Sequence, residues 1–181
     1  LWFSDADYET KGNLIKWNPA VKTAEDRDGI LKAVLNGRID VIATDHAPHT
    51  IEEKSQPYLQ APSGGPLVQH ALPAMLELYH QGKITLEQIA EKMAHNVAIC
   101  FQIEKRGYIR EGYWADLALV DLNSPWTVNK DNILYQCKWS PFDGTTFQSK
   151  IAYTIVSGNV VWADGSLVEG ENGKRLSFNR D

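Results

Sequence analysis

The spacing of hydrophobic positions changes along the chain, and this change predicts two regions. In the first hundred residues, apolar positions recur at helical spacing between Thr23, a plausible N-cap, and Gly37, a plausible stop. Residues 39–44 then form a short, β-branched, mostly apolar run, which is typical of a parallel strand covered on both faces. Further helices are expected over residues 67–79 and from Thr85, where Thr85–Gln88 resembles a capping box.

After about Gly107 the pattern becomes that of strands. Residues 115–122, 150–157 and 160–162 are expected to be strands, the last two joined by a hairpin turn at Gly158–Asn159. The second half is therefore predicted to be a small β domain. Between the two regions, residues 50–66 are expected to form one long loop, and loops of that length are usually functional or mobile.

Composition and charge narrow the functional classes. The chain has 181 residues, 43% of them hydrophobic and 23% charged, with a net charge of −5. These values predict a globular protein, and the acidic balance gives no support to nucleic-acid binding. No apolar run approaches the roughly 20 residues of a membrane span, so no membrane partner and a cytoplasmic location are expected.

The segment that carries chemistry is Thr44–His49, which reads Thr-Asp-His-Ala-Pro-His. It follows the predicted strand 39–44, and ligands of α/β folds bind at the carboxyl ends of strands. Asp45 there offers a hard oxygen ligand for a divalent metal and a group that takes and returns a proton. Taken alone, the spacing is equally compatible with a structural role, in which Asp45 caps a turn and both histidines pack in the core.

Other polar candidates are weaker by themselves. Asn18, before Pro19, can bond a planar ligand, although an Asn-Pro turn explains it more simply. Ser63 and Gly64 can present backbone amides to a ligand, although by themselves they are explained more simply by an ordinary loop turn. The other three histidines fall in predicted helices, where core or surface roles are expected: His70, His80 and His95.

The order of these motifs resembles that of the dihydroorotases, a group of cyclic amidohydrolases in the amidohydrolase superfamily. The resemblance rests on Asn18-Pro19, the string Ile39–His49, and Ala61-Pro62-Ser63-Gly64. It continues through Lys105–Ile109 and Ser140-Pro141-Phe142 and so covers nearly the whole chain. The Thr-Asp-His-Ala-Pro-His string is its most specific part, because related hydantoinases and allantoinases tend to lack the second His.

The resemblance implies a role for each matching residue. It makes Asp45 a zinc ligand and the catalytic acid and base, and it makes Asn18 and His49 substrate-binding residues. The backbone at Ser63 and Gly64 would also face the substrate. The implied cofactor is Zn²⁺, one ion or two, and the implied reaction interconverts dihydroorotate and N-carbamoyl-L-aspartate in de novo pyrimidine biosynthesis.

Two departures from the family pattern matter. The family usually continues Asn-Pro with Pro-Leu-Arg, whereas residues 20–22 read Ala-Val-Lys. The family's His-x-His metal pair, expected on the first barrel strand, occurs nowhere in the 181 residues. The chain also begins at Leu1 without a Met, so we expect a piece of a longer enzyme that is inactive alone and lacks most of the metal ligands.

The resulting expectation is an α/β fold: the C-terminal part of a TIM-type (β/α) barrel over residues 1–104, followed by a small β-sandwich domain and tail over 105–181. The complete enzyme is expected to be a homodimer, with aspartate transcarbamoylase as a further candidate partner. Two alternatives stay open. One is a hydantoinase-like or allantoinase-like cyclic amidohydrolase, and the other is a non-catalytic dihydroorotase-like scaffold for aspartate transcarbamoylase.

Overall fold

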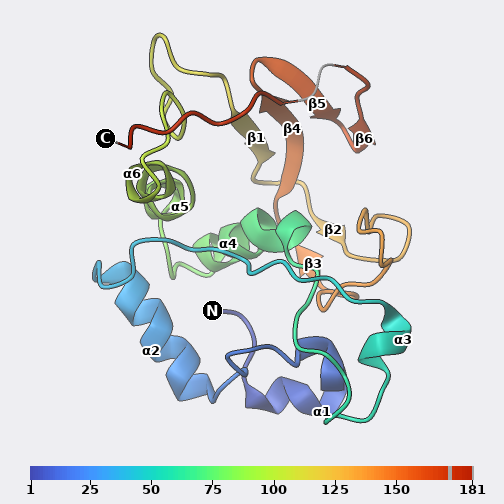
Figure 1. Cartoon of the computed structure of the whole chain (residues 1–181). Helices are drawn as coiled ribbons and strands as arrows, with labels where there is room; N and C mark the ends of the chain where they lie inside the picture. Colours follow the sequence, from blue (N-terminus) through green and yellow to red (C-terminus); the bar gives the residue numbers. More distant parts are fainter. Residues whose placement is uncertain (171–172, 181) are drawn as a thin grey trace. The chain divides into compact units, whose positions relative to one another are not determined.

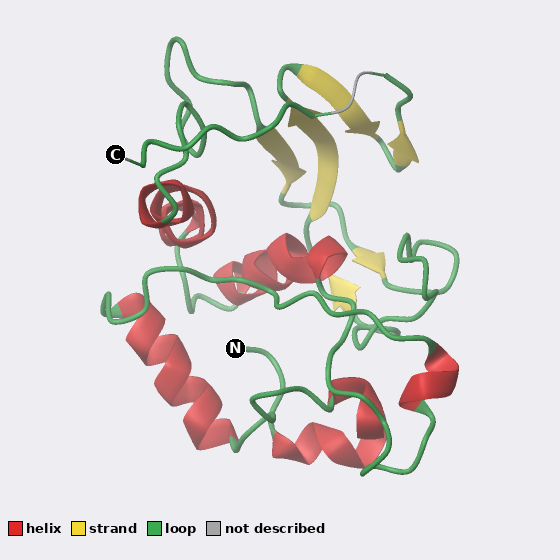
Figure 2. Cartoon of the chain, in the orientation of Figure 1, coloured by secondary structure: helices red, strands yellow, loops and turns green. Residues whose placement is uncertain are grey.

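A computed structural model describes residues 1–170 and 173–180, which form two compact units. Unit 1 comprises Leu1–Ile39, Ala43–Ala74 and Thr127–Phe147, and unit 2 comprises Asp40–Ile42, Met75–Trp126 and Gln148–Asp181. Figures 1 and 2 show that the helices come mostly from the first half of the chain and the strands from the second. The mixed helix-and-sheet class expected from the sequence is therefore confirmed.

Unit 1 carries the short helix α1 (Tyr8–Lys11), the long helix α2 (Ala24–Leu35) and the short helix α3 (Ile51–Lys54). The expected cap of α2 is present, since the Thr23 hydroxyl accepts a hydrogen bond from the Asp26 N–H and the Asp26 carboxylate accepts one from the Thr23 N–H. Helix α3 lies inside the stretch predicted to be loop. It forms because Thr50 and Glu53 make a capping box of their own.

The prediction of a strand over residues 39–44 is wrong for the described chain. These residues form no strand, and the first bridge follows at His46, which pairs in parallel with Gly65. A β-strand is defined by hydrogen bonds to a neighbouring strand, and here the Ile42 N–H donates instead to the carbonyl of Lys92, which lies within a helical segment. The apolar pattern thus identified a partly exposed, non-helical segment without identifying its hydrogen-bond partner.

Three helical segments follow in the sequence. Helix α4 (Ala71–His80) is preceded by a 3₁₀ turn at Val68–His70. Helix α5 (Leu86–Ala90) begins at the predicted Thr85 cap and continues through a π-helical turn, Glu91–His95, into α6 (Asn96–Cys100). The sequence suggested two separate helices in this stretch, whereas the structure has one continuous run.

Unit 2 contains a four-stranded antiparallel sheet in the order β1-β4-β5-β6 (Figure 1). Its strands are β1 (Leu117–Asp121), β4 (Lys150–Val156), β5 (Asn159–Ala163) and β6 (Ser166–Leu167). The hairpin turn between β4 and β5 lies at Ser157–Gly158, one residue earlier than predicted, because Val156 pairs with Asn159. Two short strands missed by the sequence reasoning, β2 (Trp126–Thr127) and β3 (Thr146–Phe147), form a second sheet.

The core of unit 1 is aromatic. Phe142 lies with its ring centroid 5.3–5.6 Å from those of Trp2, Phe3, His70 and Phe147. Phe142 and Phe147 are buried, as is His70, which is fully inaccessible. The strand-rich half of the sequence therefore supplies core residues to the unit that contains the Asp45 segment.

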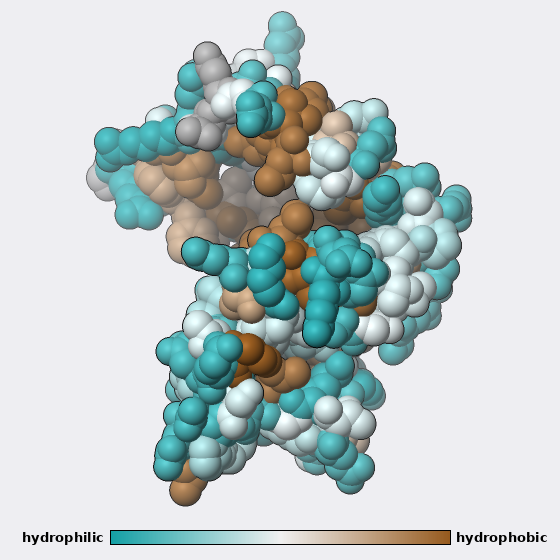
Figure 3. Space-filling view, turned by 90° about the vertical axis from the view of Figure 1, so that its right-hand side faces the viewer, coloured by the Kyte–Doolittle hydropathy of each residue, from teal (hydrophilic) through white to brown (hydrophobic). Residues whose placement is uncertain are grey.

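Several large hydrophobic side chains remain exposed, and Figure 3 shows such residues in brown on the molecular surface. In unit 2, Leu119 and Tyr153 lie opposite each other on neighbouring strands and are 43% and 37% exposed. Helices long and apolar enough to cross a membrane are not found in the described residues.

Candidate active site

The candidate site gathers around the Asp45–His49 segment of unit 1. Asp45 is exposed and has a positive φ of 46°, a conformation that Asp adopts more readily than most residues. Its side chain does not point into a packed interior. The next residue, His46, forms the parallel bridge to Gly65, so the segment and the loop 63–66 run side by side.

His49 lies against this same loop. Its Nε2 is 3.1 Å from the Ser63 carbonyl oxygen, and its Nδ1 is 3.5 Å from a carboxylate oxygen of Glu53. Because a carbonyl oxygen only accepts, Nε2–H is the donor in the bond to Ser63. The structure thus brings three residues predicted from the sequence together: His49, Ser63 and Gly64.

Gly64 occupies a position that other residues do not fit. Its φ is +133°, and a Cβ there would lie 2.6 Å from the Ala47 carbonyl oxygen. Its amide N–H donates to the Lys16 carbonyl at 3.0 Å, and its neighbour Gly65 packs against the Trp17 indole. Asn18 follows Trp17 directly and is exposed, so the stretch that leads into it runs beside the Ser63–Gly64 loop.

The buried side chain of Lys54 connects the Ser63–Gly64 loop to the stretch before Asn18. Its side chain is only 2% exposed, and Nζ donates to the carbonyl oxygens of Pro62 (2.9 Å), Gly64 (2.9 Å) and Lys16 (3.2 Å). Burial, with a smaller contribution from the charge of Lys16, lowers the pKa of Lys54 to about 8, so the ammonium keeps its charge at pH 7. The Lys16 ammonium in turn donates to the carbonyls of Tyr58 and Ala61.

His46 has a supporting position. Its Nδ1 accepts hydrogen bonds from the N–H groups of Leu67 (3.0 Å) and Val68 (3.4 Å), and its ring lies 5.4 Å from that of Tyr135. These contacts give His46 a structural role, in which its ring fixes the backbone at Leu67 and Val68. Tyr135 is itself bonded to the Gln69 N–H and lies 3.2 Å from His70 Nδ1.

Residues from the second half of the chain reach the site, and the sequence reasoning missed them. The Trp139 indole N–H donates to the His49 carbonyl at 2.7 Å. The Gln69 side chain donates to the Asn132 carbonyl and accepts from the Leu134 N–H, which ties the stretch 132–135 to the start of α4. Trp139 lies two residues before the Pro141 of a motif noted from the resemblance, so its neighbourhood was marked but its contact was not.

The described residues do not form a complete metal site. In residues 1–170 and 173–180, no three His, Cys, Asp or Glu side chains are grouped so as to hold an ion. Asp45 offers one carboxylate, and its exposed position leaves that carboxylate accessible to an ion held by other groups. A single ligand of this kind does not hold Zn²⁺, so the fit is partial at best.

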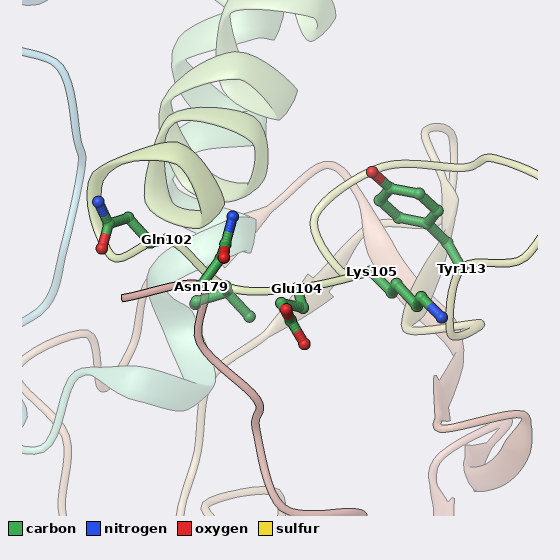
Figure 4. Close-up of a pocket in the computed structure, with 6 residues that line it drawn as sticks. Gln102, Glu104, Lys105, Tyr113 and Asn179 are labelled. Atoms are coloured by element: carbon green, nitrogen blue, oxygen red, sulfur yellow. The ribbon is translucent and has the colours of Figure 1, made fainter. Parts of the chain in front are cut away.

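A shallow pocket of 410 Å³ lies elsewhere, in unit 2. Figure 4 shows Gln102 and Asn179 on one side and Lys105 and Tyr113 on the other, with Glu104 between them. It includes none of the predicted site residues. We therefore place the candidate active site at the Asp45–His49 segment.

Known proteins are similar to this chain in sequence and in structure. The model of the amidohydrolase family matches residues 10–161. The chain belongs to the amidohydrolase family. Metal dependence is general in this family.

Two curated relatives of this amidohydrolase are named dihydroorotase. The protein from Halobacterium salinarum is 37% identical and that from Pyrococcus furiosus 34% identical, each over 176 residues. Both alignments cover 97% of this chain but 41% of the relative. This amidohydrolase therefore spans about two-fifths of the length of the relatives it matches.

Solved structures are similar to this amidohydrolase over the same share. L-hydantoinase (dihydropyrimidinase) from Arthrobacter aurescens superposes with a TM-score of 0.88 and 29% identity, covering 92% of this chain and 38% of that chain. Dihydropyrimidinase from Brevibacillus agri gives a TM-score of 0.85 at 22% identity over the same fractions, which supports the fold alone.

Proposed function

We propose that this chain is the C-terminal part of a zinc-dependent dihydroorotase, which interconverts dihydroorotate and N-carbamoyl-L-aspartate in pyrimidine biosynthesis. The observation that carries the proposal is the meeting of His49 with Ser63 and Gly64 beside the exposed Asp45, in a chain whose relatives are named dihydroorotase. On this proposal, residues 1–104 contribute the last part of a TIM-type barrel and residues 105–181 a small β-sandwich domain. The two contact-defined units place Thr127–Phe147 with the first half, so the boundary at 104 stays a prediction about the complete enzyme.

The proposed chemistry assigns each residue a task. Asp45 accepts a proton from the water that adds to the ring carbonyl carbon, and it returns that proton to the ring nitrogen as the carbon–nitrogen bond breaks. Asn18 and His49 bind the substrate's polar groups, while the amide backbone at Ser63 and Gly64 lies against the ring. Holding the ring in one orientation lowers the activation free energy of the reaction by several kcal/mol.

Asp45 would be one of the ligands of the one or two zinc ions. The other ligands would come from other residues of the complete enzyme, since residues 1–170 and 173–180 hold no group of three such side chains.

The test is turnover by the complete enzyme, with this chain joined to the rest of the protein. Dihydroorotate should be hydrolysed faster than hydantoin or allantoin. His49→Ala should lower kcat/KM for dihydroorotate by about 100-fold, because a substrate contact is lost. Lys32→Met, on the exposed side of α2, is the matched control and should leave kcat/KM unchanged.

A hydantoinase-like activity is the second candidate, and the superposition on L-hydantoinase at 29% identity favours it. Faster turnover of hydantoin than of dihydroorotate would establish this alternative. Absence of hydrolysis of any of the three cyclic amides by a zinc-loaded complete protein would leave the scaffold role.

A further inference from the structure

The buried ammonium of Lys54 is not used by the proposed chemistry, yet it contacts the backbone of the loop that contains Ser63 and Gly64. We propose that Lys54 is a positioning residue, whose three hydrogen bonds to backbone carbonyls fix the Ser63–Gly64 loop in the conformation that receives the substrate. This inference rests on the proposed function and adds to it a residue that touches no substrate.

The geometry of the contacts carries the first step. The three acceptors of Lys54 come from two stretches that are far apart in sequence: Lys16, and the pair Pro62 and Gly64. An ammonium has three donor hydrogens and no acceptor, so these three carbonyls match its full capacity. One side chain on α3 thus ties the stretch before Asn18 to the loop that lies against His49.

The carbonyl of Lys16 connects the same two stretches a second time. It accepts from the Lys54 ammonium and also from the Gly64 N–H at 3.0 Å. Carbonyl oxygens have two lone pairs, so both bonds are made together. Loss of the ammonium would leave the carbonyls of Pro62 and Gly64 without this donor and remove a side-chain connection between them and Lys16.

The capping of α3 carries the third step. Lys54 is the last residue of a four-residue helix, whose start is fixed by the Thr50–Glu53 capping box. Glu53 also faces His49 Nδ1 at 3.5 Å. The same short helix therefore aims Lys54 at the loop from one side and a carboxylate at His49 from the other. The charged groups beside Lys54 are Lys16 across the loop and Glu52 and Glu53 on its own helix.

A surface role would not need this arrangement. Lysines are among the residues that are least often fully buried, and removing an ammonium from water is costly unless its donors are satisfied. An apolar side chain would fill the space at lower cost. A lysine that meets three carbonyls supplies directional bonds, and directional bonds fix backbone positions.

Lys54→Met tests the inference, because methionine keeps the length of the side chain and removes all three donors. In the complete enzyme, KM for dihydroorotate should rise at least tenfold while kcat changes less than threefold. Partial misfolding alone would lower the amount of active enzyme and leave KM unchanged. Lys32→Met, an exposed lysine on α2, is the matched control and should change neither constant.

A second measurement does not depend on the function. In residues 1–181 of the Lys54→Met variant, amide hydrogen exchange followed by NMR should accelerate at least tenfold at Gly64 and at Ala47, whose N–H donates to the Gly65 carbonyl. Exchange in the middle of α2 should not change. If exchange at Gly64 is unaltered, or if it accelerates while KM does not rise, the inference is wrong.

A wild-type experiment covers the case in which Lys54→Met fails to fold. Reductive methylation of Lys54 in the complete enzyme should be slowed at least fivefold by dihydroorotate, because bound substrate favours the conformation in which Lys54 is bonded to the loop and inaccessible to the reagent. Methylation of the exposed Lys32 should not respond. Equal rates with and without dihydroorotate would overturn the inference. If wild-type enzyme shows no turnover of dihydroorotate, the proposed function fails instead, and the exchange measurement alone decides whether Lys54 anchors the loop.

Discussion

His46 and His49 lie three positions apart, and the structure gives them different surroundings. His46 accepts hydrogen bonds from the backbone N–H groups of Leu67 and Val68, so its ring orders the chain after the Gly65 bridge. His49 instead faces the loop carbonyl of Ser63 and the carboxylate of Glu53. Pro48 between them excludes a regular helix, and this is why the two rings do not share one face.

His70 illustrates a histidine that serves the core. Its side chain is fully inaccessible, and its Nδ1 lies 3.2 Å from the Tyr135 hydroxyl and 3.1 Å from that of Ser140. Burial lowers the pKa of His70 to about 4 from an ordinary value near 6.5. The core role expected for this histidine is confirmed.

A pH dependence of stability follows for His70. Because its folded-state pKa is depressed, only the unfolded chain takes up this proton between pH 6.5 and 4. The contribution of neutral His70 to the free energy of unfolding is therefore fully present above pH 6.5. It is lost as the pH falls, and the loss is on the order of 3 kcal/mol at pH 4. Urea unfolding across this range, compared with His70→Asn, isolates the contribution, and equal pH dependence in both proteins would contradict it.

The helix caps are the elements that the sequence predicted best. Thr23 and Thr85 were both expected to begin helices, and both accept the N–H of the residue three positions later. Caps are local, since the side chain and the amide that it satisfies lie within four residues. The hairpin turn was displaced by one residue for a different reason, because its position depends on the register between β4 and β5.

Removal of the α2 cap should have a measurable cost. Thr23→Ala leaves the Asp26 N–H without its side-chain acceptor, and the free energy of unfolding should fall by about 1 kcal/mol. Thr23→Ser keeps the hydroxyl, so its free energy of unfolding should fall by much less. Denaturant unfolding of the two variants measures the difference, and equal losses would show that the cap does not stabilise α2.

Segment 39–49 shows which features of an element the local sequence does not predict. Its apolar run predicted a buried strand, and its polar end predicted a site, but strand pairing is made with partners that local sequence does not name. Asp45 is exposed, and His49 contacts the Ser63 carbonyl, while the substrate-binding roles that the resemblance implied for these residues stay predictions. The contacts of Lys54 and Trp139 were not foreseen, because they depend on residues that meet only in the folded chain.

At the scale of the whole molecule, the proposed function predicts that this chain alone binds Zn²⁺ more weakly than the complete enzyme does. One exposed carboxylate without a cluster of ligands does not hold an ion tightly, since affinity comes from several donors in fixed geometry. Calorimetric titration of residues 1–181 with Zn²⁺ should show only weak binding. Stoichiometric binding with a sub-micromolar Kd would contradict this and would require a ligand set that the described residues do not show.

Dimerisation and association with aspartate transcarbamoylase stay predictions for the complete enzyme. The exposed hydrophobic residues of unit 2, such as Leu119 and Tyr153, are compatible with burial by further chain.

The bond from the Trp139 indole to the His49 carbonyl has a practical consequence for engineering. A chimera that joined residues 1–104 to the tail of a relative would bring in a foreign counterpart of Trp139, and of Tyr135 beside His46. Substrate preference would then change together with the tail, although no substrate-binding residue had been exchanged. Recombination of such enzymes is safer when Thr127–Phe147 travels with the histidine string that it supports.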